Sequence, residues 1–198
     1  MGNKIVYLLK YLTKMTKKDV ISKLPIYKLQ TTGEVLKYYK TWTTNNKYNK
    51  DMVDWNYTAP REAVNLLKKY TTNKSSRILD AGCGTGLVGI ELKNIGYSYI
   101  EGVDFSQDML DLVPSNIYKV LNKINLNQKL KITSNTYDIV ICVGTFTFGH
   151  VKAHALDELI RIIKNKGLIC FTINEGIYKE YEFDKKIKKL SDNKIWEM

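Results

Sequence analysis

The sequence is poor in several residue types, and each shortage narrows what the chain can be. Its 198 residues include three prolines, three cysteines and two histidines, and three arginines stand against 28 lysines. The cysteines, at positions 83, 142 and 170, fit neither a disulfide framework nor a zinc knuckle, which indicates a reducing compartment. No apolar run approaches the ~20 residues of a membrane-spanning helix. We therefore expect a cytoplasmic or nuclear protein that does not span a membrane.

The charge of the chain is strongly one-sided. A net charge of +11 and a pI near 9.4 suggest a nucleic-acid partner, because cationic surfaces attract the phosphates of a nucleic acid whatever its base sequence. The lysines are scattered rather than gathered on one stripe, which is typical of solvated surface faces. A nucleic-acid partner is therefore an alternative that we do not favour.

The two histidines, His150 and His154, are four residues apart and could share a helix face. Two ligands without a nearby third are weak grounds for a metal site, so we expect capping or packing roles and no metal.

The alternation of apolar segments predicts the fold class. Hydrophobic residues make up 44% of the chain, enough for one domain with a full core. Short apolar runs alternate with segments of helical periodicity, a pattern typical of an α/β fold with a doubly wound, mostly parallel sheet. Residues 152–164, for example, carry apolar residues at helical spacing, and residues 168–173 form the next apolar run.

The most informative stretch is ILDAGCGTG at residues 78–86, an apolar run that ends in an acid and leads into three alternating glycines. A strand that turns at once into a helix needs conformations open to glycine, and a ligand lying against the turn needs residues without a Cβ atom. Gly82, Gly84 and Gly86 supply both, and Gly96 can end the helix that follows. The pattern predicts a strand, loop and helix unit with a ligand at the loop.

Two kinds of ligand compete for this loop. Residues 84–89 also satisfy G-x-G-x-x-G, the dinucleotide fingerprint, so spacing alone decides nothing. A dinucleotide brings a pyrophosphate, which the carboxylate of Asp80 would repel. S-adenosylmethionine instead brings an ammonium and a sulfonium, which that carboxylate attracts. We therefore favour the sulfonium compound.

A second acid supports this interpretation. Residues 100–104 read as the next strand, and Asp104 at its carboxyl end is placed to accept both ribose hydroxyls, with Phe105 against the adenine. The alternative is that Asp104 merely precedes a helix capped by Ser106. Both roles can hold at once.

At this point the sequence resembles a known family. The segments ILDAGCGTG, EGVDFSQDML and YDIVICVGTFTFGHV look like those of class I S-adenosylmethionine-dependent methyltransferases. The lead-in KYNKDMVDWNYTAPREAV and the FGHV loop resemble the Williams-Beuren region methyltransferase-like group. The resemblance covers residues 39–172 and implies a Rossmann-like fold, S-adenosyl-L-methionine as cofactor and methyl transfer as the reaction.

The resemblance also implies roles for individual residues. The glycine loop with its acid would bind the methionine moiety, the next acid the ribose, and Phe105 and Met109 the adenine. The third strand, at 120–124, ends in Asn125-Leu126 where the family usually has an acid, and an amide oxygen can still accept a hydrogen bond from adenine. The expected cofactor-binding residues are Asp80, Gly82, Cys83, Gly84, Gly86, Asp104, Phe105, Met109, Asn125, Leu126, Val143, Gly144, Phe146, Tyr48 and Tyr57.

The substrate side is less defined. Phe148 and His150, in the loop after the fourth strand, would face the acceptor. His150 is the candidate catalytic base, because its unperturbed pKa suits proton removal near neutrality. The same loop lacks the Asn/Asp-Pro-Pro-aromatic signature of base amino-methyltransferases, which makes RNA a less favoured acceptor than a small molecule or protein.

The chain divides into a basic amphipathic lead at 1–38 and a methyltransferase domain at 39–198. Within the domain we expect an aromatic lid at 39–59, a cofactor-binding core at 60–174 and a carboxyl-terminal helix at 178–191. The lid aromatics could equally cover the edge of the core.

The carboxyl end departs from the family, because the β-hairpin that normally completes the sheet is missing. Residues 168–173 would then form an exposed apolar edge, which predicts either a monomer or a dimer paired across that edge. The missing hairpin also leaves open a catalytically impaired protein that binds S-adenosylmethionine or S-adenosylhomocysteine.

Overall fold

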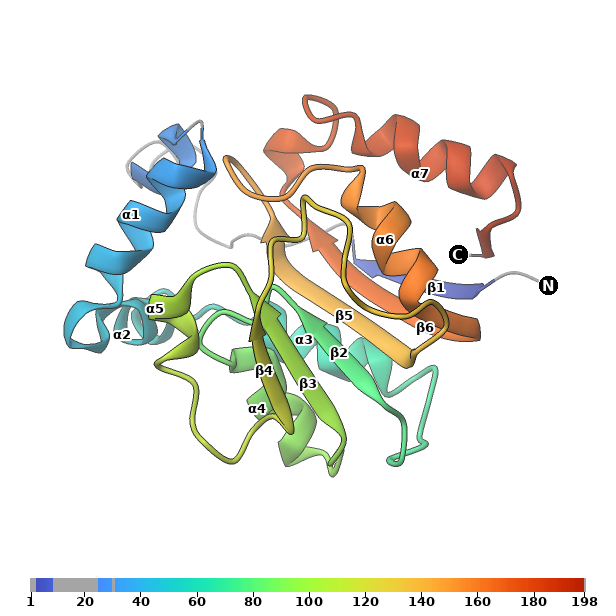
Figure 1. Ribbon diagram of the computed structural model, residues 1–198, viewed down its shortest axis with the longest axis horizontal. Helices are drawn as coiled ribbons and strands as arrows, with labels where there is room; N and C mark the ends of the chain where they lie inside the picture. Colours follow the sequence, from blue (N-terminus) through green and yellow to red (C-terminus); the bar gives the residue numbers. More distant parts are fainter. Residues whose placement is uncertain (1–2, 9–24, 30, 198) are drawn as a thin grey trace.

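One parallel sheet forms the centre of the molecule (Figure 1). This computed structural model describes residues 3–8, 25–29 and 31–197. Seven strands lie in the order β4-β3-β2-β5-β6-β1-β7, and each adjacent pair is parallel. The strands are β1 (Asn3–Leu8), β2 (Ile78–Ala81), β3 (Ile100–Asp104), β4 (Val120–Lys123), β5 (Tyr137–Phe146), β6 (Ile163–Ile173) and β7 (Trp196–Glu197). The predicted doubly wound parallel sheet is confirmed.

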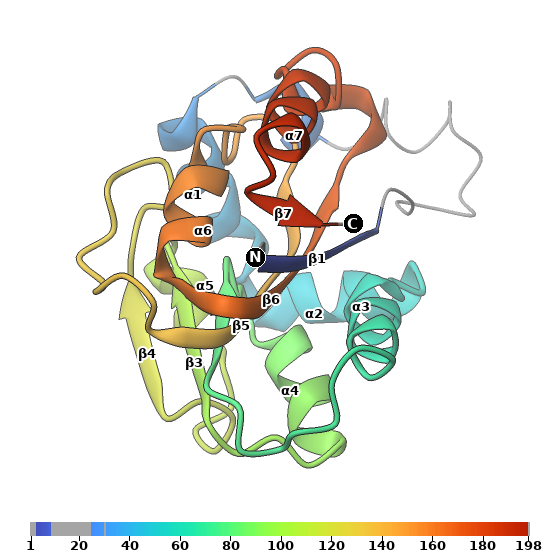
Figure 2. The ribbon, with the colours of Figure 1, turned by 90° about the vertical axis from the view of Figure 1, so that its right-hand side faces the viewer.

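Helices cover both faces of the sheet, as two perpendicular views show (Figures 1 and 2). The α-helices are α1 (Thr32–Trp42), α2 (Lys47–Asp54), α3 (Ala59–Leu67), α4 (Leu87–Asn94), α5 (Gln107–Leu110), α6 (Ala155–Ile162) and α7 (Phe183–Asp192). The described residues also form the short 3-10 helices η1 (Pro25–Lys28), η2 (Thr44–Asn46) and η3 (Glu175–Ile177). Within the described part of the chain, none of the helices has the length and apolar character needed to cross a membrane.

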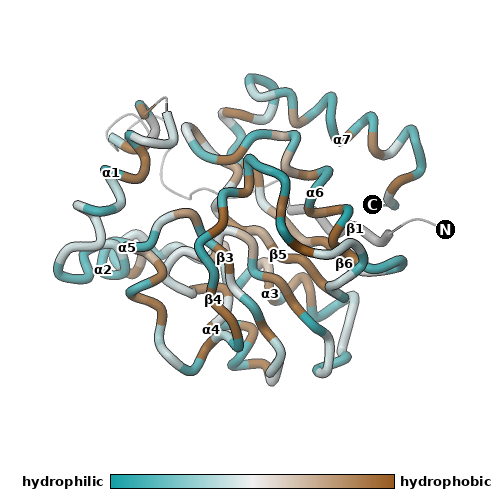
Figure 3. Tube along the Cα trace, viewed as in Figure 1, coloured by the Kyte–Doolittle hydropathy of each residue, from teal (hydrophilic) through white to brown (hydrophobic). Residues whose placement is uncertain are grey.

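Alternating residues of the strands pack into two separate hydrophobic cores, one on each face of the sheet. Val140 and Cys142 of β5 join a cluster completed by α6 and α7, whereas Ile139 and Ile141 join one completed by α3 and α4. This period of two is what a sheet buried on both faces requires. The central strands are accordingly mostly hydrophobic, while the outer turns of α7 are hydrophilic (Figure 3).

The strand order reverses between β2 and β5. From β2 the chain steps outward through β3 to β4 on one side, and then returns to place β5 on the other side of β2. The connections that leave the carboxyl ends of β2 and β5 therefore lead to opposite sides, and open α/β sheets bind ligands in the crevice at such a point.

The edge of β6 is covered, which corrects one expectation. Residues 168–172 pair with Lys4–Leu8 of β1, so the apolar run 168–173 is buried and is not the exposed edge that we predicted. This edge is therefore not available for pairing with a second copy of the chain, which was the basis for the expected dimer. The predicted lead at 1–38 supplies a strand of the sheet, and its residues 9–24 lie outside the described residues.

Helix α1 begins at a capping box. The Thr31 hydroxyl accepts from the Glu34 backbone N–H at 3.2 Å, and the Glu34 carboxylate accepts from the Thr31 N–H at 2.9 Å. This cap fixes the start of the helix that crosses the open end of the crevice, where Val35 is buried.

A charged clamp holds the loop between β4 and β5 against α6. Arg161 donates to the carbonyls of Ile132 and Leu130 at 2.8 and 3.0 Å, and to Glu158 at 2.7 and 2.8 Å. Glu158 also accepts from the Leu130 N–H at 2.7 Å. The hydrogen bonds from Arg161 lower the pKa of Glu158 to about 2. This loop carries residues 125–127 to the crevice.

We predict that Arg161→Lys lowers the free energy of unfolding by about 1–3 kcal/mol in chemical denaturation, because lysine keeps the charge but loses the planar fork. The stabilisation by Glu158 should be fully present above the ordinary pKa of 4.5 and should be lost as the pH falls toward 2. Arg61→Lys, on the exposed face of α3, is the matched control. Equal stability of the two variants would show that the clamp contributes nothing.

Candidate functional site

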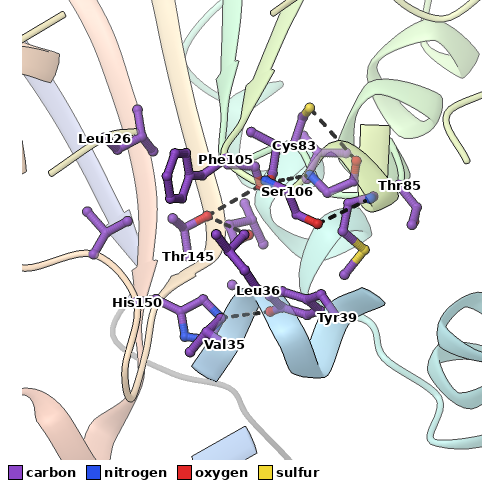
Figure 4. Close-up of a pocket in the computed structure, with 18 of the residues that line it drawn as sticks. Val35, Leu36, Tyr39, Cys83, Thr85, Phe105, Ser106, Leu126, Thr145 and His150 are labelled. Atoms are coloured by element: carbon purple, nitrogen blue, oxygen red, sulfur yellow. Dashed lines mark hydrogen bonds between the residues drawn. The ribbon is translucent and has the colours of Figure 1, made fainter. Parts of the chain in front are cut away.

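A cavity opens where the carboxyl ends of β2, β3 and β5 meet, beneath α1 and the segment that follows it (Figure 4). Its position at the reversal of strand order is the one expected for a ligand site in this class of sheet. The lining residues are Thr32, Val35, Leu36, Tyr39, Tyr48, Tyr57, Pro60, Gly82, Cys83, Gly84, Thr85, Leu87, Val88, Asp104, Phe105, Ser106, Met109, Ile124, Asn125, Leu126, Asn127, Val143, Gly144, Thr145, His150 and Val151.

The glycines of the loop serve different purposes. Gly82 has φ of +79°, and a Cβ there would lie 2.1 Å from the Thr145 hydroxyl oxygen, so this position is reserved for packing against β5. Gly84, with φ of +53°, has nothing within 4 Å of such a Cβ. Gly86 lies outside the cavity lining and faces Val113 and Tyr118. The open space that a ligand could fill is therefore beside Gly84.

Asp104 ties the glycine loop to the next strand. One carboxylate oxygen accepts from the Gly84 N–H at 2.9 Å and the other from the Ser106 N–H at 2.8 Å. Burial raises the pKa of Asp104, whereas these two backbone N–H groups act in the opposite direction. Ser106 also caps α5 by accepting from the Met109 N–H, so both roles expected of this segment are compatible.

Asp80 lies behind the loop rather than in the cavity wall. Its side chain is fully buried, one oxygen accepts from the Tyr118 hydroxyl at 2.6 Å, and Oδ1 has no hydrogen-bond partner among the described residues. Burial raises the pKa of Asp80 to about 7. We expected this carboxylate to contact a cationic ligand directly. The structure does not place it in the cavity wall, where such a contact would be made.

The far end of the cavity has an apolar wall with amide groups. Phe105 and Met109 line it from the strand and helix after Asp104, and Leu126 lines it from the opposite loop. The Asn125 side-chain oxygen accepts from the Asn127 N–H at 2.9 Å, which forms a tight turn and leaves that oxygen a second lone pair. A planar heterocycle fits such a wall.

The aromatic segment before α3 closes the other end. Tyr39, Tyr48 and Tyr57 line the cavity. Asn49 of α2 accepts from the Thr85 hydroxyl at 2.6 Å, so this segment is fastened directly to the glycine loop.

His150 is in the cavity wall and is half-buried. Its Nε2 lies 2.7 Å from the Tyr39 hydroxyl, and its Nδ1 is hydrogen-bonded to the Phe148 carbonyl. Burial lowers the pKa of His150, and the bond to the Phe148 carbonyl raises it by less. The ring is therefore neutral near neutral pH.

Most of the predicted site residues meet at this cavity, and four do not. Asp80 is fully buried within β2, and Gly86 stands at the start of α4, where it faces Val113 and Tyr118. Phe146 is 1% exposed and contacts Phe171 and Phe183 in the core, since β5 continues as far as residue 146 and turns its side chain inward. Phe148 contacts Tyr181 and does not line the cavity.

Several lining residues escaped the sequence analysis. Thr85 and Ser106 are polar neighbours of the two motifs and could have been proposed from them. Val35, Leu36 and Tyr39 come from the predicted lead and its border, and Thr145 and Asn127 follow from tertiary contacts alone. Tyr118, which occupies the space beside Gly86 and Gly89, carried no local signal.

The charge of the cavity contrasts with that of the chain. Of the described residues that line it, Asp104 is the one with a formal charge at neutral pH, and none is lysine or arginine. A wall with a single carboxylate and no cation attracts a cationic ligand and disfavours a diphosphate. The groups present therefore fit an adenosyl sulfonium compound better than a dinucleotide.

Comparisons with known proteins agree with this fit. Residues 78–167 match the model of a methyltransferase domain family. A Thermotoga maritima structure described as an S-adenosylmethionine-dependent methyltransferase aligns with a TM-score of 0.51 at 24% identity, covering 67% of this chain and 58% of that one, which supports the fold. The chain belongs to the S-adenosylmethionine-dependent methyltransferases, whose cofactor is S-adenosyl-L-methionine.

Two named proteins are similar to this chain in sequence. Human methyltransferase-like protein 27 is 34% identical over 173 residues, which cover 83% of this chain and 69% of that protein. The malonyl-[acyl-carrier protein] O-methyltransferase of Bacillus anthracis is 31% identical over 119 residues, covering 58% of this chain. The chain spans 44% of the length of that bacterial protein.

We predict that Asp80→Asn removes a pH-dependent loss of stability. A carboxyl group whose folded pKa is raised to about 7 stabilises the folded state fully below its unfolded pKa, and that contribution is lost as the pH rises through 7. Urea denaturation should therefore show the wild type losing up to about 4 kcal/mol relative to the variant between about pH 4 and pH 7. Parallel pH curves would contradict this assignment.

Proposed function

We propose that this chain binds S-adenosylmethionine in the cavity and transfers its methyl group to a small acceptor. Asp104 holds the ribose hydroxyls, the loop from Gly82 to Thr85 holds the methionine moiety, and Asn125 accepts from the adenine amine. The support for these roles is that Gly84 borders open space while the Asp104 carboxylate lines the same cavity. Both carboxylate oxygens keep lone pairs for hydroxyl donors after accepting from Gly84 and Ser106.

The other expected contacts follow from the same arrangement. Phe105, Met109 and Leu126 pack against the adenine, and Val143 and Gly144 at the end of β5 border the sulfur end of the ligand. Tyr48 and Tyr57 reach the cavity from the segment at 39–59, which we propose acts as a lid. The hydrogen bond between Asn49 and Thr85 supports that role, because it joins the lid to the ligand loop.

The acceptor that we propose is a small molecule without a carboxylate or phosphate near its reacting atom. The observation that carries this proposal is the absence of lysine and arginine from the described cavity wall, in a chain with 31 of these residues. An anionic acceptor buried beside Asp104 would meet no cationic side chain on the described wall and would be repelled by that carboxylate, which is costly in a low dielectric. A malonyl carboxylate, the acceptor in the name of the Bacillus anthracis relative, and an RNA phosphate backbone both fit this wall poorly.

The reaction asks little of the protein beyond positioning. The cofactor, when bound, supplies a methyl group that the sulfonium has already activated. The chain's own contribution is to orient the acceptor in line with that group and to exclude water, for which the apolar Val35 and Leu36 of α1 and the lid tyrosines are suited.

We also propose that the protein works in a reducing compartment such as the cytoplasm. Cys83, Cys142 and Cys170 are all free and buried, and burial raises the pKa of each thiol. Such thiols behave as small apolar groups rather than as disulfide partners.

Gly84→Ala tests the ligand site, and the strain of a side chain at its φ of +53° is matched in the control below. The new methyl group would project into the open space, so we expect S-adenosylmethionine affinity to fall at least about tenfold in calorimetry. Gly96→Ala is the matched control, because Gly96 also has a positive φ, +94°, with nothing within 4 Å of a Cβ, but lies at the end of α4 away from the cavity. Similar affinities of the two variants would place the ligand elsewhere.

The acceptor class can be tested by turnover. Metabolite extracts separated by charge, together with total RNA, would be incubated with S-adenosylmethionine, and S-adenosylhomocysteine release would be measured. We expect release with uncharged or cationic fractions, and its loss in Gly84→Ala. Release supported by the anionic fraction or by RNA would overturn the proposed acceptor class, and binding of the cofactor without release in any fraction would favour a non-catalytic adenosyl-binding protein.

A further inference from the structure

A tyrosine and a histidine from distant parts of the chain form a hydrogen-bonded pair in the cavity wall. The Tyr39 hydroxyl on α1 and Nε2 of His150, in the loop after β5, are 2.7 Å apart and the two side chains point toward one another (Figure 4). Both residues line the cavity that holds the proposed cofactor site. In Figure 4 the pair lies across the cavity from Cys83 of the glycine loop.

The partners of the imidazole determine where its proton lies. Nδ1 is bonded to the Phe148 carbonyl, which can only accept, so Nδ1 carries the hydrogen. Nε2 then has a lone pair and accepts from the Tyr39 hydroxyl. In this tautomer, a proton that arrives at Nε2 produces an imidazolium whose other N–H already has a fixed acceptor.

The pair is held rigidly. The Tyr39 ring stacks on Trp42 at 6.1 Å with an interplanar angle of 4°, and it meets the His150 ring edge-on at 5.5 Å. Trp42 is fixed in turn, because its indole N–H donates to Asp51 at 2.6 Å. Fixed geometry of this kind is what a proton-transferring pair needs.

Two other titratable groups on the described wall are less suited to this task. The Asp104 carboxylate accepts two backbone N–H groups and is assigned to the ribose. Cys83 is buried, and burial raises the pKa of its thiol. The neutral imidazole of His150, reached through Tyr39, is the better proton acceptor near neutral pH.

We propose that Tyr39 and His150 take the proton of the methyl acceptor, with Tyr39 touching the acceptor and His150 acting through it. This inference rests on the proposed function. A bond forms between the acceptor's heteroatom and the methyl carbon, while the bond from that carbon to sulfur breaks and its electron pair stays on sulfur. The acceptor proton passes to the Tyr39 oxygen as the Tyr39 proton passes to Nε2 of His150. The acceptor is then a hydroxyl or amine compound with a proton to lose.

Adenosyl analogues test the pair without a known acceptor. Sinefungin carries a primary amine at the position of the transferred methyl group, whereas S-adenosylhomocysteine has nothing there. Calorimetry should show that Tyr39→Phe weakens sinefungin about tenfold, the loss expected for a charge-assisted hydrogen bond, and changes S-adenosylhomocysteine less than about twofold. Tyr38→Phe, the neighbouring tyrosine on α1 that contacts Trp42 and does not line the cavity, should change neither.

Nitrogen NMR of the histidines tests the tautomer and the hydrogen bond on which the proton transfer depends. With His154→Gln as background, the signal of His150 should show protonated Nδ1 and unprotonated Nε2, and Tyr39→Phe should shift the Nε2 resonance. A protonated Nε2 at neutral pH, or no shift in the variant, would overturn the pair.

The outcomes of the binding experiment are distinct. Equal weakening of both analogues by Tyr39→Phe would mean that Tyr39 only supports the site, and no change in either would mean that it does not face the transferred group; both results overturn the inference. Failure of the wild type to bind either analogue would instead refute the proposed function on which the inference rests.

Discussion

The site depends on the carboxylate of Asp104. Its two oxygens take backbone N–H groups from Gly84, in the loop after β2, and from Ser106, at the start of α5. Because these segments leave neighbouring strands, one side chain sets the distance between them and fixes the orientation of the glycine loop. A carboxylate in this place also makes the cavity anionic, in a chain whose surface is strongly cationic.

The remaining parts of the site are assembled around that anchor from distant elements. The loop between β4 and β5 comes to the cavity because Arg161 and Glu158 fasten it to α6. The segment from α1 to α2 arrives from the other side, joined through Asn49 to Thr85 and through Tyr39 to His150. The cavity is therefore enclosed by polar contacts between elements, and its inner surface stays largely apolar.

The sequence predicted the strands that follow local patterns and the motifs at their ends. The cofactor loop, Asp104, the fourth strand, expected at 137–143, and the apolar helix, expected at 152–164, all follow from periodicity and from glycine and cap signals, which act over a few residues. Asp80 shows the limit of such reasoning. Its place at the end of an apolar run predicts a ligand contact, yet the Tyr118 hydroxyl, from beyond β3, donates a hydrogen bond to it. A tertiary contact of this kind cannot be predicted from a local sequence pattern.

The same limit explains the two larger differences. The side chains of a strand alternate, so Phe146 changes from ligand contact to core residue once β5 extends beyond residue 143. The apolar run at 168–173 lacked a neighbour in the sequence analysis, because its neighbour β1 lies at the opposite end of the chain. The carboxyl-terminal helix begins at Phe183 rather than 178, where η3 and a turn intervene.

The pairing of β1 with β6 has a consequence for how the molecule comes into being. Residues 4–8 leave the ribosome long before residues 168–172, their partners in the sheet. Strand β1 must wait without this neighbour until β6 has been made, and pairings between such remote segments form slowly. The pairing of β1 with β6 is thus a late event in folding, and a ribosome-bound nascent chain ending before β6 holds a β1 segment without that partner.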